Sequence, residues 1–321
     1  MRVLITGAQG CIGAWVTKEL LERGADVIAY DLEPDPVRLA LIASPDQIRK
    51  VRFEIGAIQD TDRVKALVRD NGVTHIVHLA AVLIPYCQAN PVEGAKINVL
   101  GTLNVFEAAR DAGRTVRVVY ASSAAVWGPG DAYPDRPLTE RDPLQPSTFY
   151  GIYKQSNESC AAVFHQSAGI SSVGLRPWTV YGVGRDRGLT ADPTFALRAA
   201  ALRMPYQIRL TGPMDLQYVE DVAAAFVRCL ESNVEGAHVC NLAGEIVEMD
   251  ALIAAIESIR PEVRGQLTCA GPRVPVAVQM DDGLLQTLVP GIRRTPLESG
   301  LRATIERFED LVRAGRISGI Q

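Results

Sequence analysis

Short apolar runs alternate along the first 180 residues with longer segments whose apolar residues recur at helical spacing. The expected strands include RVLIT, DVIAY, KVRFE, HIVHLAA and RVVYASS. Helical segments follow to about Arg23, through Val68, over NVLGTLNVFEAAR and from near Tyr150, whereas a loop is expected after DVIAY. Apolar strands separated by helices are typical of a parallel sheet covered on both faces. We therefore predict an α/β fold: a Rossmann-type doubly wound parallel sheet with a smaller C-terminal lobe.

A glycine-rich stretch, TGAQGCIG, lies where the strand RVLI passes into a helix. Its glycines, Gly7, Gly10 and Gly13, form GxxGxxG, one residue longer than the GxGxxG fingerprint. Glycines at such a turn let the backbone approach a pyrophosphate and bring its charge to a helix N-terminus. The stretch therefore predicts dinucleotide binding.

Asp31 ends the second predicted strand, about 20 residues beyond the glycines. A carboxylate at this place accepts hydrogen bonds from the adenosine ribose and repels a 2′-phosphate. The following residues, Leu32, Glu33 and Pro34, provide no arginine to compensate. NAD is therefore favoured over NADP as the cofactor.

The stretch PSTFYGIYK contains two tyrosines before Lys154. Tyr150 and Lys154 are four residues apart and share one helix face, whereas Tyr153 is rotated away from Tyr150. A nearby ammonium lowers the pKa of a tyrosine, so Tyr150 is the candidate acid/base. Ser123, at the end of RVVYASS, is expected at the carboxyl edge of the sheet, where its hydroxyl can hold the reacting oxygen.

Composition narrows the possible partners and location. The 321 residues carry a net charge of −4 without a basic run, so we expect no nucleic-acid partner. No apolar stretch approaches the roughly 20 residues that span a bilayer, and MRVLITGAQG lacks the features of a secretory signal. The six cysteines form no CxxC pair, and the four histidines stand mostly in apolar contexts. We expect a cytoplasmic protein without a metal or membrane partner.

Taken together, these motifs resemble the extended short-chain dehydrogenases/reductases of the NAD-dependent epimerase/dehydratase family. The resemblance is carried by TGAQGCIG, HLAA at 78–81, KINVLGTLN, ASSAAVWG, YGIYK, LRPWTVYG and QYVEDVA, and it runs through essentially the whole chain. It implies an NAD-binding domain of residues 1–182 with about 214–242, and a substrate-binding lobe of residues 183–213 and 243–321. It also implies a homodimer formed through the helices around 97–112 and 150–167.

The family pattern implies a set of site residues. It places Ser123, Tyr150 and Lys154 in the active site, with Lys154 also bound to the nicotinamide ribose. The other expected cofactor contacts are Gly7, Gly10, Cys11, Ile12, Gly13, Asp31, Ile58, Leu79, Ala80, Ala81, Asn98 and Pro177. Asn98 is expected to brace the catalytic helix. Ala124, Thr179 and Arg185 are candidate substrate contacts.

Departures from the family pattern bear on the reaction. Ala124 and Ala125 stand where dehydratases and decarboxylases carry acidic residues, which disfavours both reactions. Thr179 and Met214 replace the asparagine and arginine that hold a nucleotide diphosphate, although Arg185, Arg187, Arg209 or Arg273 could compensate. Ala57 removes an expected adenine contact and leaves Ile58 and Asp60 as possible partners.

The main functional hypothesis is an NAD-dependent dehydrogenase that oxidises a secondary hydroxyl of a sugar, sugar acid or hydroxy acid, with Tyr150 as base. The alternative is a nucleotide-sugar 4-epimerase, such as one for UDP-sugars, that uses the same Ser-Tyr-Lys set. A non-catalytic NAD-sensing protein is a third, weaker hypothesis, because a sensor has no need of Ser123, Tyr150 and Lys154 together.

Overall fold

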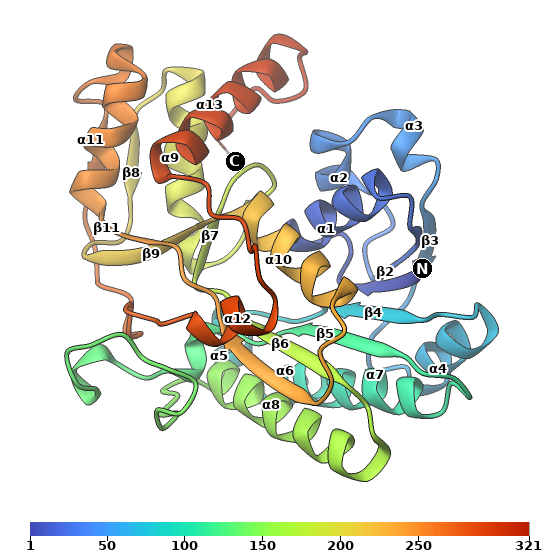
Figure 1. Ribbon diagram of the computed structural model, residues 1–321. Coiled ribbons are helices and arrows are strands. Elements are labelled where there is room, and N and C mark those ends of the chain that lie inside the picture. Colours follow the sequence, from blue (N-terminus) through green and yellow to red (C-terminus); the bar gives the residue numbers. More distant parts are fainter. Residues whose placement is uncertain (321) are drawn as a thin grey trace.

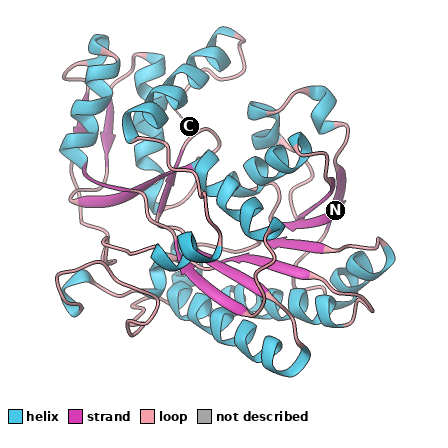
Figure 2. Ribbon diagram, in the orientation of Figure 1, coloured by secondary structure: helices cyan, strands magenta, loops and turns pink. Residues whose placement is uncertain are grey.

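The computed structural model describes residues 1–320 and has a seven-stranded parallel sheet at its centre (Figures 1 and 2). The strand order is β10-β6-β5-β4-β1-β2-β3. Its strands are β1 (Arg2–Thr6), β2 (Asp26–Asp31), β3 (Arg52–Ile55), β4 (His75–His78), β5 (Arg117–Ala121), β6 (Ser172–Arg176) and β10 (Ala237–Asn241). The predicted doubly wound parallel sheet is confirmed.

Helices cover both faces of this sheet, as the unbroken apolar character of its strands requires. Val3 and Ile5 of β1 belong to the core cluster shared with α1 (Cys11–Glu22) and α10 (Val219–Glu231). Leu4 points the opposite way, into the cluster formed with α4 (Thr61–Asp70) and α7 (Gly101–Arg110). The long helix α8 (Phe149–Ala168) packs beside α7 on this second face.

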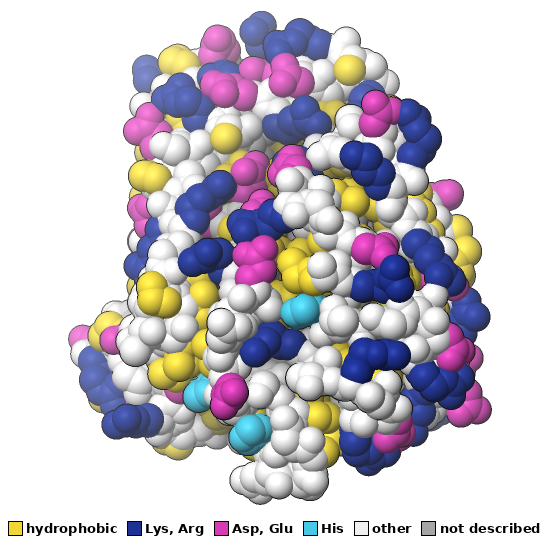
Figure 3. Space-filling view, turned by 45° about the vertical axis from the view of Figure 1, so that its right-hand side comes forward, with side chains coloured by type: hydrophobic (Ala, Val, Ile, Leu, Met, Phe, Trp, Pro, Cys, Tyr) yellow, Lys and Arg dark blue, Asp and Glu magenta, His cyan; other side chains and the backbone are white. Residues whose placement is uncertain are grey.

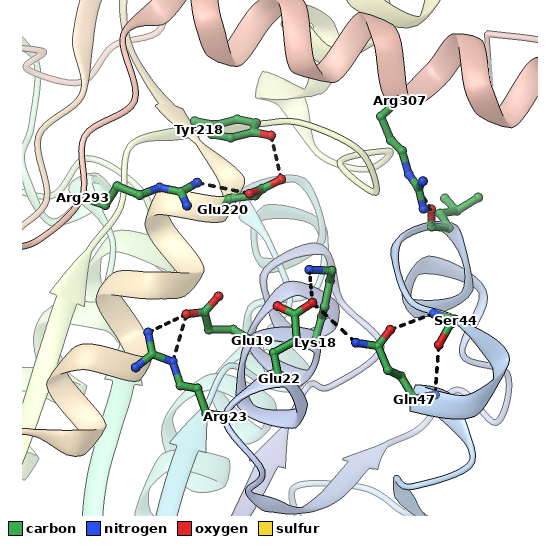
Figure 4. Close-up of polar contacts among 11 residues, drawn as sticks. Lys18, Glu19, Glu22, Arg23, Ser44, Gln47, Tyr218, Glu220, Arg293 and Arg307 are labelled. Atoms are coloured by element: carbon green, nitrogen blue, oxygen red, sulfur yellow. Dashed lines mark hydrogen bonds and ion pairs between the residues drawn. The ribbon is translucent and has the colours of Figure 1, made fainter.

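Two local features differ from the sequence prediction. The expected loop after β2 contains two short helices, α2 (Val37–Ile42) and α3 (Pro45–Ile48). A capping box explains α3, because the Ser44 and Gln47 side chains each bind the other's backbone N–H (Figure 4). The helix expected from Asn98 begins as a π-helix, η1 (Lys96–Leu100), preceded by α5 (Ile84–Ala89) and α6 (Pro91–Ala95).

The later part of the chain builds two small sheets and their helices. One sheet has the order β11-β9-β7, from Glu245–Glu248, Pro213–Tyr218 and Thr179–Tyr181, and the other pairs β12 (Leu267–Cys269) with β8 (Tyr206–Ile208). The accompanying helices are α9 (Asp192–Leu202), α11 (Met249–Ile259), α12 (Gly283–Leu288) and α13 (Leu297–Arg313). The chain also has four short 3-10 turns in residues 1–320: η2 (Ala124–Val126), η3 (Gly130–Ala132), η4 (Leu189–Ala191) and η5 (Pro261–Val263). The proposed domain boundaries stay a prediction.

Contacts from α13 and α10 tie the later elements to the first half of the chain. Arg307 of α13, labelled in Figure 4, donates to the carbonyl of Leu41 in α2 at 3.1 and 2.6 Å. Arg23, just after α1, pairs with Glu231 of α10 at 2.8 Å. These contacts hold α1 and α2, which follow β1 and β2, against the later helices.

The face of the molecule in Figure 3 mixes cationic and anionic side chains without a broad region of one sign. No helix in residues 1–320 combines the length and apolar character that crossing a membrane requires. Of the four histidines, His78 is fully buried, between Thr6 and Thr102, with ring nitrogens 2.7 and 3.0 Å from their hydroxyls.

Candidate active site

The glycine-rich loop has the geometry that close approach of a phosphate requires. Gly7 has φ of +70°, and a Cβ there would lie 2.5 Å from the backbone N of Ala80. A Cβ on Gly13 would lie 2.4 Å from the Gly7 carbonyl oxygen, so a side chain at either position would push the loop apart. The loop leads into the 12-residue helix α1, whose N-terminus is suited to a pyrophosphate. These residues fit a dinucleotide.

Asp31 lies at the carboxyl end of β2 beside this loop. Its Oδ2 accepts the backbone N–H of Gln9 at 2.8 Å, so the carboxylate is fixed next to the glycines. The sequence provides no arginine directly after Asp31, but the fold brings in Arg38 from α2. Arg38 Nη1 donates to the Gln9 carbonyl at 2.7 Å, and its other nitrogens bind Asp186. This arginine escaped sequence reasoning because the expected loop is a helix that turns back toward the cavity.

A cavity of about 630 Å³ runs from this loop to α8, the helix of Tyr150 and Lys154. Most of the predicted site residues line it: Gly7, Gly10, Cys11, Ile12, Gly13, Asp31, Ile58, Leu79, Ala80, Ala81, Ser123, Ala124, Tyr150, Lys154, Pro177 and Arg185. Residues from distant parts of the chain therefore meet at the carboxyl edge of the sheet, the usual ligand site of doubly wound folds.

Two predicted contacts lie outside the lining of this cavity. Thr179 is fully buried in β7, where it pairs with Leu216, and its neighbours Trp178 and Val180 line the cavity instead. This result follows from strand geometry, because successive side chains point to opposite faces. We therefore correct the prediction that Thr179 contacts the substrate.

Asn98 also lies outside the cavity lining, behind the catalytic helix. Its side-chain amide donates to the carbonyls of Val82 at 3.2 Å and Gly94 at 3.0 Å. Its backbone carbonyl accepts the Asn157 side chain of α8 at 3.0 Å. Asn98 thus joins the π-helix to α8 and holds the catalytic helix, whereas the predicted direct contact with the cofactor is not part of this arrangement. Asp60, the other possible adenine partner, caps α4 by accepting the backbone N–H of Arg63 at 3.0 Å.

The predicted catalytic residues come together because α8 starts close to the end of β5. The Thr148 side chain caps α8 by accepting the backbone N–H of Gly151 at 3.1 Å. Gly151 is required there, since a Cβ would lie 2.2 Å from the carbonyl oxygen of Ala125. The same close approach brings the first turn of α8, with Tyr150, next to the segment that begins with Ser123.

Tyr150 and Lys154 lie on one face of α8, as their spacing predicts. The Lys154 ammonium is 5.5 Å from the centre of the Tyr150 ring and donates to the Ala121 carbonyl at 2.6 Å. Burial raises the pKa of Tyr150 to about 12, while the Ser123 hydroxyl and Arg185 act to lower it. Burial also lowers the pKa of Lys154 to about 8. Tyr150 is thus protonated at neutral pH, ready to act as an acid, and needs added positive charge to act as a base.

Tyr153 has a different environment. Its hydroxyl donates to the Pro91 carbonyl at 2.7 Å, and its ring stacks on Phe149. It does not line the cavity. The structure therefore separates the two tyrosines as their helical spacing predicts.

A buried ion pair supports the catalytic helix from behind. Glu158, one turn beyond Lys154, accepts two hydrogen bonds from Arg176 of β6 at 2.8 and 2.7 Å and a third from Ser122. The Arg176 guanidinium also lies 4.8 Å from the centre of the Trp127 ring. Sequence reasoning missed this pair, because residues 158 and 176 show no pattern that marks them as partners.

The cavity also has an apolar wall that the motifs did not predict. Trp178 follows β6, while Val274 and Val276 come from the segment between β12 and α12. The Trp178 ring is fixed by a 2.8 Å hydrogen bond from its Nε1 to the Ala277 carbonyl. Met214, which stands in place of the family's diphosphate-binding arginine by the resemblance, is fully buried in β9 and absent from this lining.

This combination of glycine loop, strand-end aspartate and Ser-Tyr-Lys cluster on a doubly wound sheet defines an NAD-dependent Rossmann enzyme. The sequence model described as the NAD dependent epimerase/dehydratase family matches residues 3–243, and the chain belongs to this family. NAD is accordingly its cofactor, and the prediction that the chain is an enzyme is confirmed.

Two relatives of this chain are named as sugar-nucleotide epimerases. UDP-glucose 4-epimerase of Lactobacillus helveticus is 32% identical over 194 residues, 60% of this chain and 56% of that protein. UDP-glucuronate 4-epimerase 2 of Arabidopsis thaliana is 32% identical over 185 residues, 56% of this chain and 42% of that protein. The chain thus spans about half the length of these relatives.

The fold likeness extends over nearly the whole chain. A UDP-glucose 4-epimerase of Thermus thermophilus, solved in complex with NAD, superposes with a TM-score of 0.80 at 26% identity. The superposition covers 96% of this chain and 99% of that one. These comparisons favour the epimerase alternative of the sequence analysis over its main dehydrogenase hypothesis.

Proposed function

We propose that this enzyme is a nucleotide-sugar 4-epimerase that oxidises and then reduces one secondary carbon of its substrate. The observation that carries the proposal is the meeting of Ser123, Tyr150 and Lys154 with the glycine loop in one cavity. The epimerase relatives provide independent support for the reaction class.

In the proposed reaction, the Tyr150 hydroxyl is the group that moves the proton. Bound NAD supplies a hydride acceptor and its positive nicotinamide ring. Tyr150 first releases its own proton to bulk water and becomes a phenolate. The Ser123 hydroxyl then donates to the reacting oxygen, and the Tyr150 phenolate removes the proton of the substrate hydroxyl. Because positive charge stabilises phenolate, the nearby Lys154 ammonium assists this step. Tyr150 returns the proton when the ketone is reduced on its opposite face.

Arg185 is the proposed contact for the anionic part of the substrate. It lines the cavity, donates to the Thr190 hydroxyl at 3.1 Å, and forms no ion pair with any carboxylate in residues 1–320. An unpaired guanidinium in a cavity is suited to a diphosphate or a sugar carboxylate. Arg185 thereby provides a cation that Met214 cannot.

A second candidate is the dehydrogenase of the sequence analysis, acting on a sugar, sugar acid or hydroxy acid. It is favoured by the apolar wall of Trp178, Val274 and Val276 and by the burial of Met214. A substrate without a nucleotide would need fewer polar partners in this part of the cavity. The two candidates differ in whether reduced cofactor accumulates.

The test incubates the purified protein with UDP-glucose and UDP-glucuronate, and separately with NAD plus aldonates, uronates and free sugars. The epimerase proposal predicts 4-epimers by NMR without a net rise in absorbance at the NADH band. Steady NADH production from a free sugar or sugar acid, without conversion of either UDP-sugar, would establish the dehydrogenase instead. The Tyr150→Phe protein is the control for both arms.

We also propose that the protein is a homodimer, and its cytoplasmic location stays a prediction. Four large apolar side chains, Leu100, Phe149, Ile152 and Val163, are at least 40% exposed on η1 and α8. These are the helices that the family resemblance assigns to the dimer contact. Light scattering should give twice the monomer mass for the native chain and the monomer mass for Ile152→Glu. A native monomer would contradict the proposal.

A further inference from the structure

The end of the cavity expected to hold the adenosine contains Arg38, whose guanidinium is already paired with a carboxylate. Arg38 and Asp31 both bind the backbone of Gln9. Asp31 accepts the Gln9 N–H at 2.8 Å, and Arg38 donates to the Gln9 carbonyl at 2.7 Å. The guanidinium and the carboxylate expected to bind the ribose therefore contact the same residue. Both side chains line the cavity.

Asp186 is the carboxylate that forms an ion pair with Arg38. Its Oδ1 accepts Nε of Arg38 at 3.0 Å and Nη2 at 2.7 Å, and its Oδ2 lies 3.1 Å from the same Nε. The arginine side chain is 12% exposed, whereas that of Asp186 is 41% exposed. The aspartate belongs to the loop after β7, 148 positions along the chain, and it also lines the cavity.

We propose that Asp186 is a specificity residue, which keeps the enzyme selective for NAD by holding the Arg38 guanidinium away from a ribose 2′-phosphate. Asp31 excludes that phosphate by repulsion, and Asp186 removes the cation that would otherwise attract it. Specificity would thus rest on two carboxylates from separate parts of the chain.

The local charges support this division of roles. Three carboxylates, of Asp31, Glu33 and Asp186, line the cavity together with the guanidinium groups of Arg38, Arg185 and Arg187. Arg187 Nη1 lies 3.8 Å from Glu33, so it also has an acidic neighbour. Converting Asp186 to an amide would leave Arg38 with unmatched charge next to the ribose site, where a bidentate phosphate contact is favourable.

The test measures binding of NADH and NADPH to the native protein, without substrate, by cofactor fluorescence. Asp186→Asn should tighten NADPH binding by about tenfold or more relative to NADH, the usual effect of one charged hydrogen bond. Asp310→Asn, which breaks an exposed pair with Arg313 on α13, is the matched control and should leave the ratio unchanged. Adding Arg38→Gln to Asp186→Asn should remove the gain.

The proposal is overturned if Asp186→Asn leaves the ratio of the two dissociation constants unchanged. It is equally overturned if both cofactors lose affinity to the same extent, since Asp186 would then only fix its loop. A gain that persists in the double variant would exclude Arg38 as the phosphate partner. The inference rests on NAD binding alone, so it can stand even if the proposed epimerase reaction fails.

Discussion

Replacing each of the two tyrosines of α8 in turn should affect different properties: one substitution should lower turnover, and the other should lower stability. Removing the Tyr150 hydroxyl by Tyr150→Phe deletes the proposed acid/base and leaves the packed ring in place. General acid–base catalysis is worth about 10²- to 10⁴-fold, so kcat should fall by at least about a hundredfold. The hydroxyl faces Ser123 in the cavity and makes no hydrogen bond to the backbone of residues 1–320, so the melting temperature should change little.

Tyr153→Phe is the matched variant, with the same atom removed three residues away. Its hydroxyl donates to the Pro91 carbonyl at 2.7 Å, and losing this bond costs about 1 kcal/mol of unfolding free energy. For a chain of this length, such a loss lowers the melting temperature by roughly 1 to 2 °C. Because Tyr153 does not line the cavity, kcat should stay within about twofold of the native value.

The measurements are steady-state turnover, cofactor binding by fluorescence, and thermal unfolding by calorimetry on all three proteins. Equal loss of activity in both variants would refute the assignment, as would an active Tyr150→Phe. A large drop in melting temperature for Tyr150→Phe would instead indicate a structural role that the contacts do not show.

Three further perturbations follow from the geometry. Gly13→Ala should weaken NAD binding more than tenfold in fluorescence titration, because its Cβ would lie 2.4 Å from the Gly7 carbonyl oxygen. Burial lowers the pKa of His78 from 6.5 to about 3. As the pH falls from 6.5 to 3, the unfolded chain therefore binds a proton at His78 that the folded chain does not bind. Unfolding free energy should then decrease by up to about 5 kcal/mol between pH 6.5 and 3, as chemical denaturation can measure. Glu158→Gln should cost about 3 to 5 kcal/mol by the same method, because it leaves the buried Arg176 charge without its partner.

Each of these has a control and a contrary outcome. Gly10→Ala should be milder, since its Cβ would come only to 3.1 Å of the Gly7 carbonyl oxygen, and equal effects would discount the steric argument. The pH slope should flatten in His78→Asn, and an unchanged slope would assign it to other groups. Glu298→Gln, which breaks an exposed pair with Arg302, should cost less than about 1 kcal/mol. A similar cost for the buried and exposed pairs would contradict the desolvation argument.

The sequence predicts the parallel sheet and the catalytic cluster because both depend on local patterns. Continuous apolar strands fix the sheet, and the spacing of Tyr150 and Lys154 fixes their common helix face. Ser123 and Asp31 follow from their places at strand ends, since such ends meet at one edge of a parallel sheet.

Other features depend on tertiary contacts that leave no local pattern. Arg38 and Asp186 are brought together only because α2 and the loop after β7 fold over the same cavity. Thr179 was placed by analogy with a family motif, and strand alternation turns its side chain away from the cavity. The apolar wall at Val274 and Val276 comes from a segment without any motif.

The most direct test of the central claim uses UDP-glucose that carries deuterium at C4. An enzyme that removes the C4 hydride and returns it within one cavity should give the 4-epimer with deuterium retained at C4, seen by NMR, without accumulation of NADH. The Tyr150→Phe protein should give at most about one hundredth of this rate. Deuterium lost from C4, or found in accumulating reduced cofactor beside an oxidised sugar, would contradict the proposed epimerase cycle.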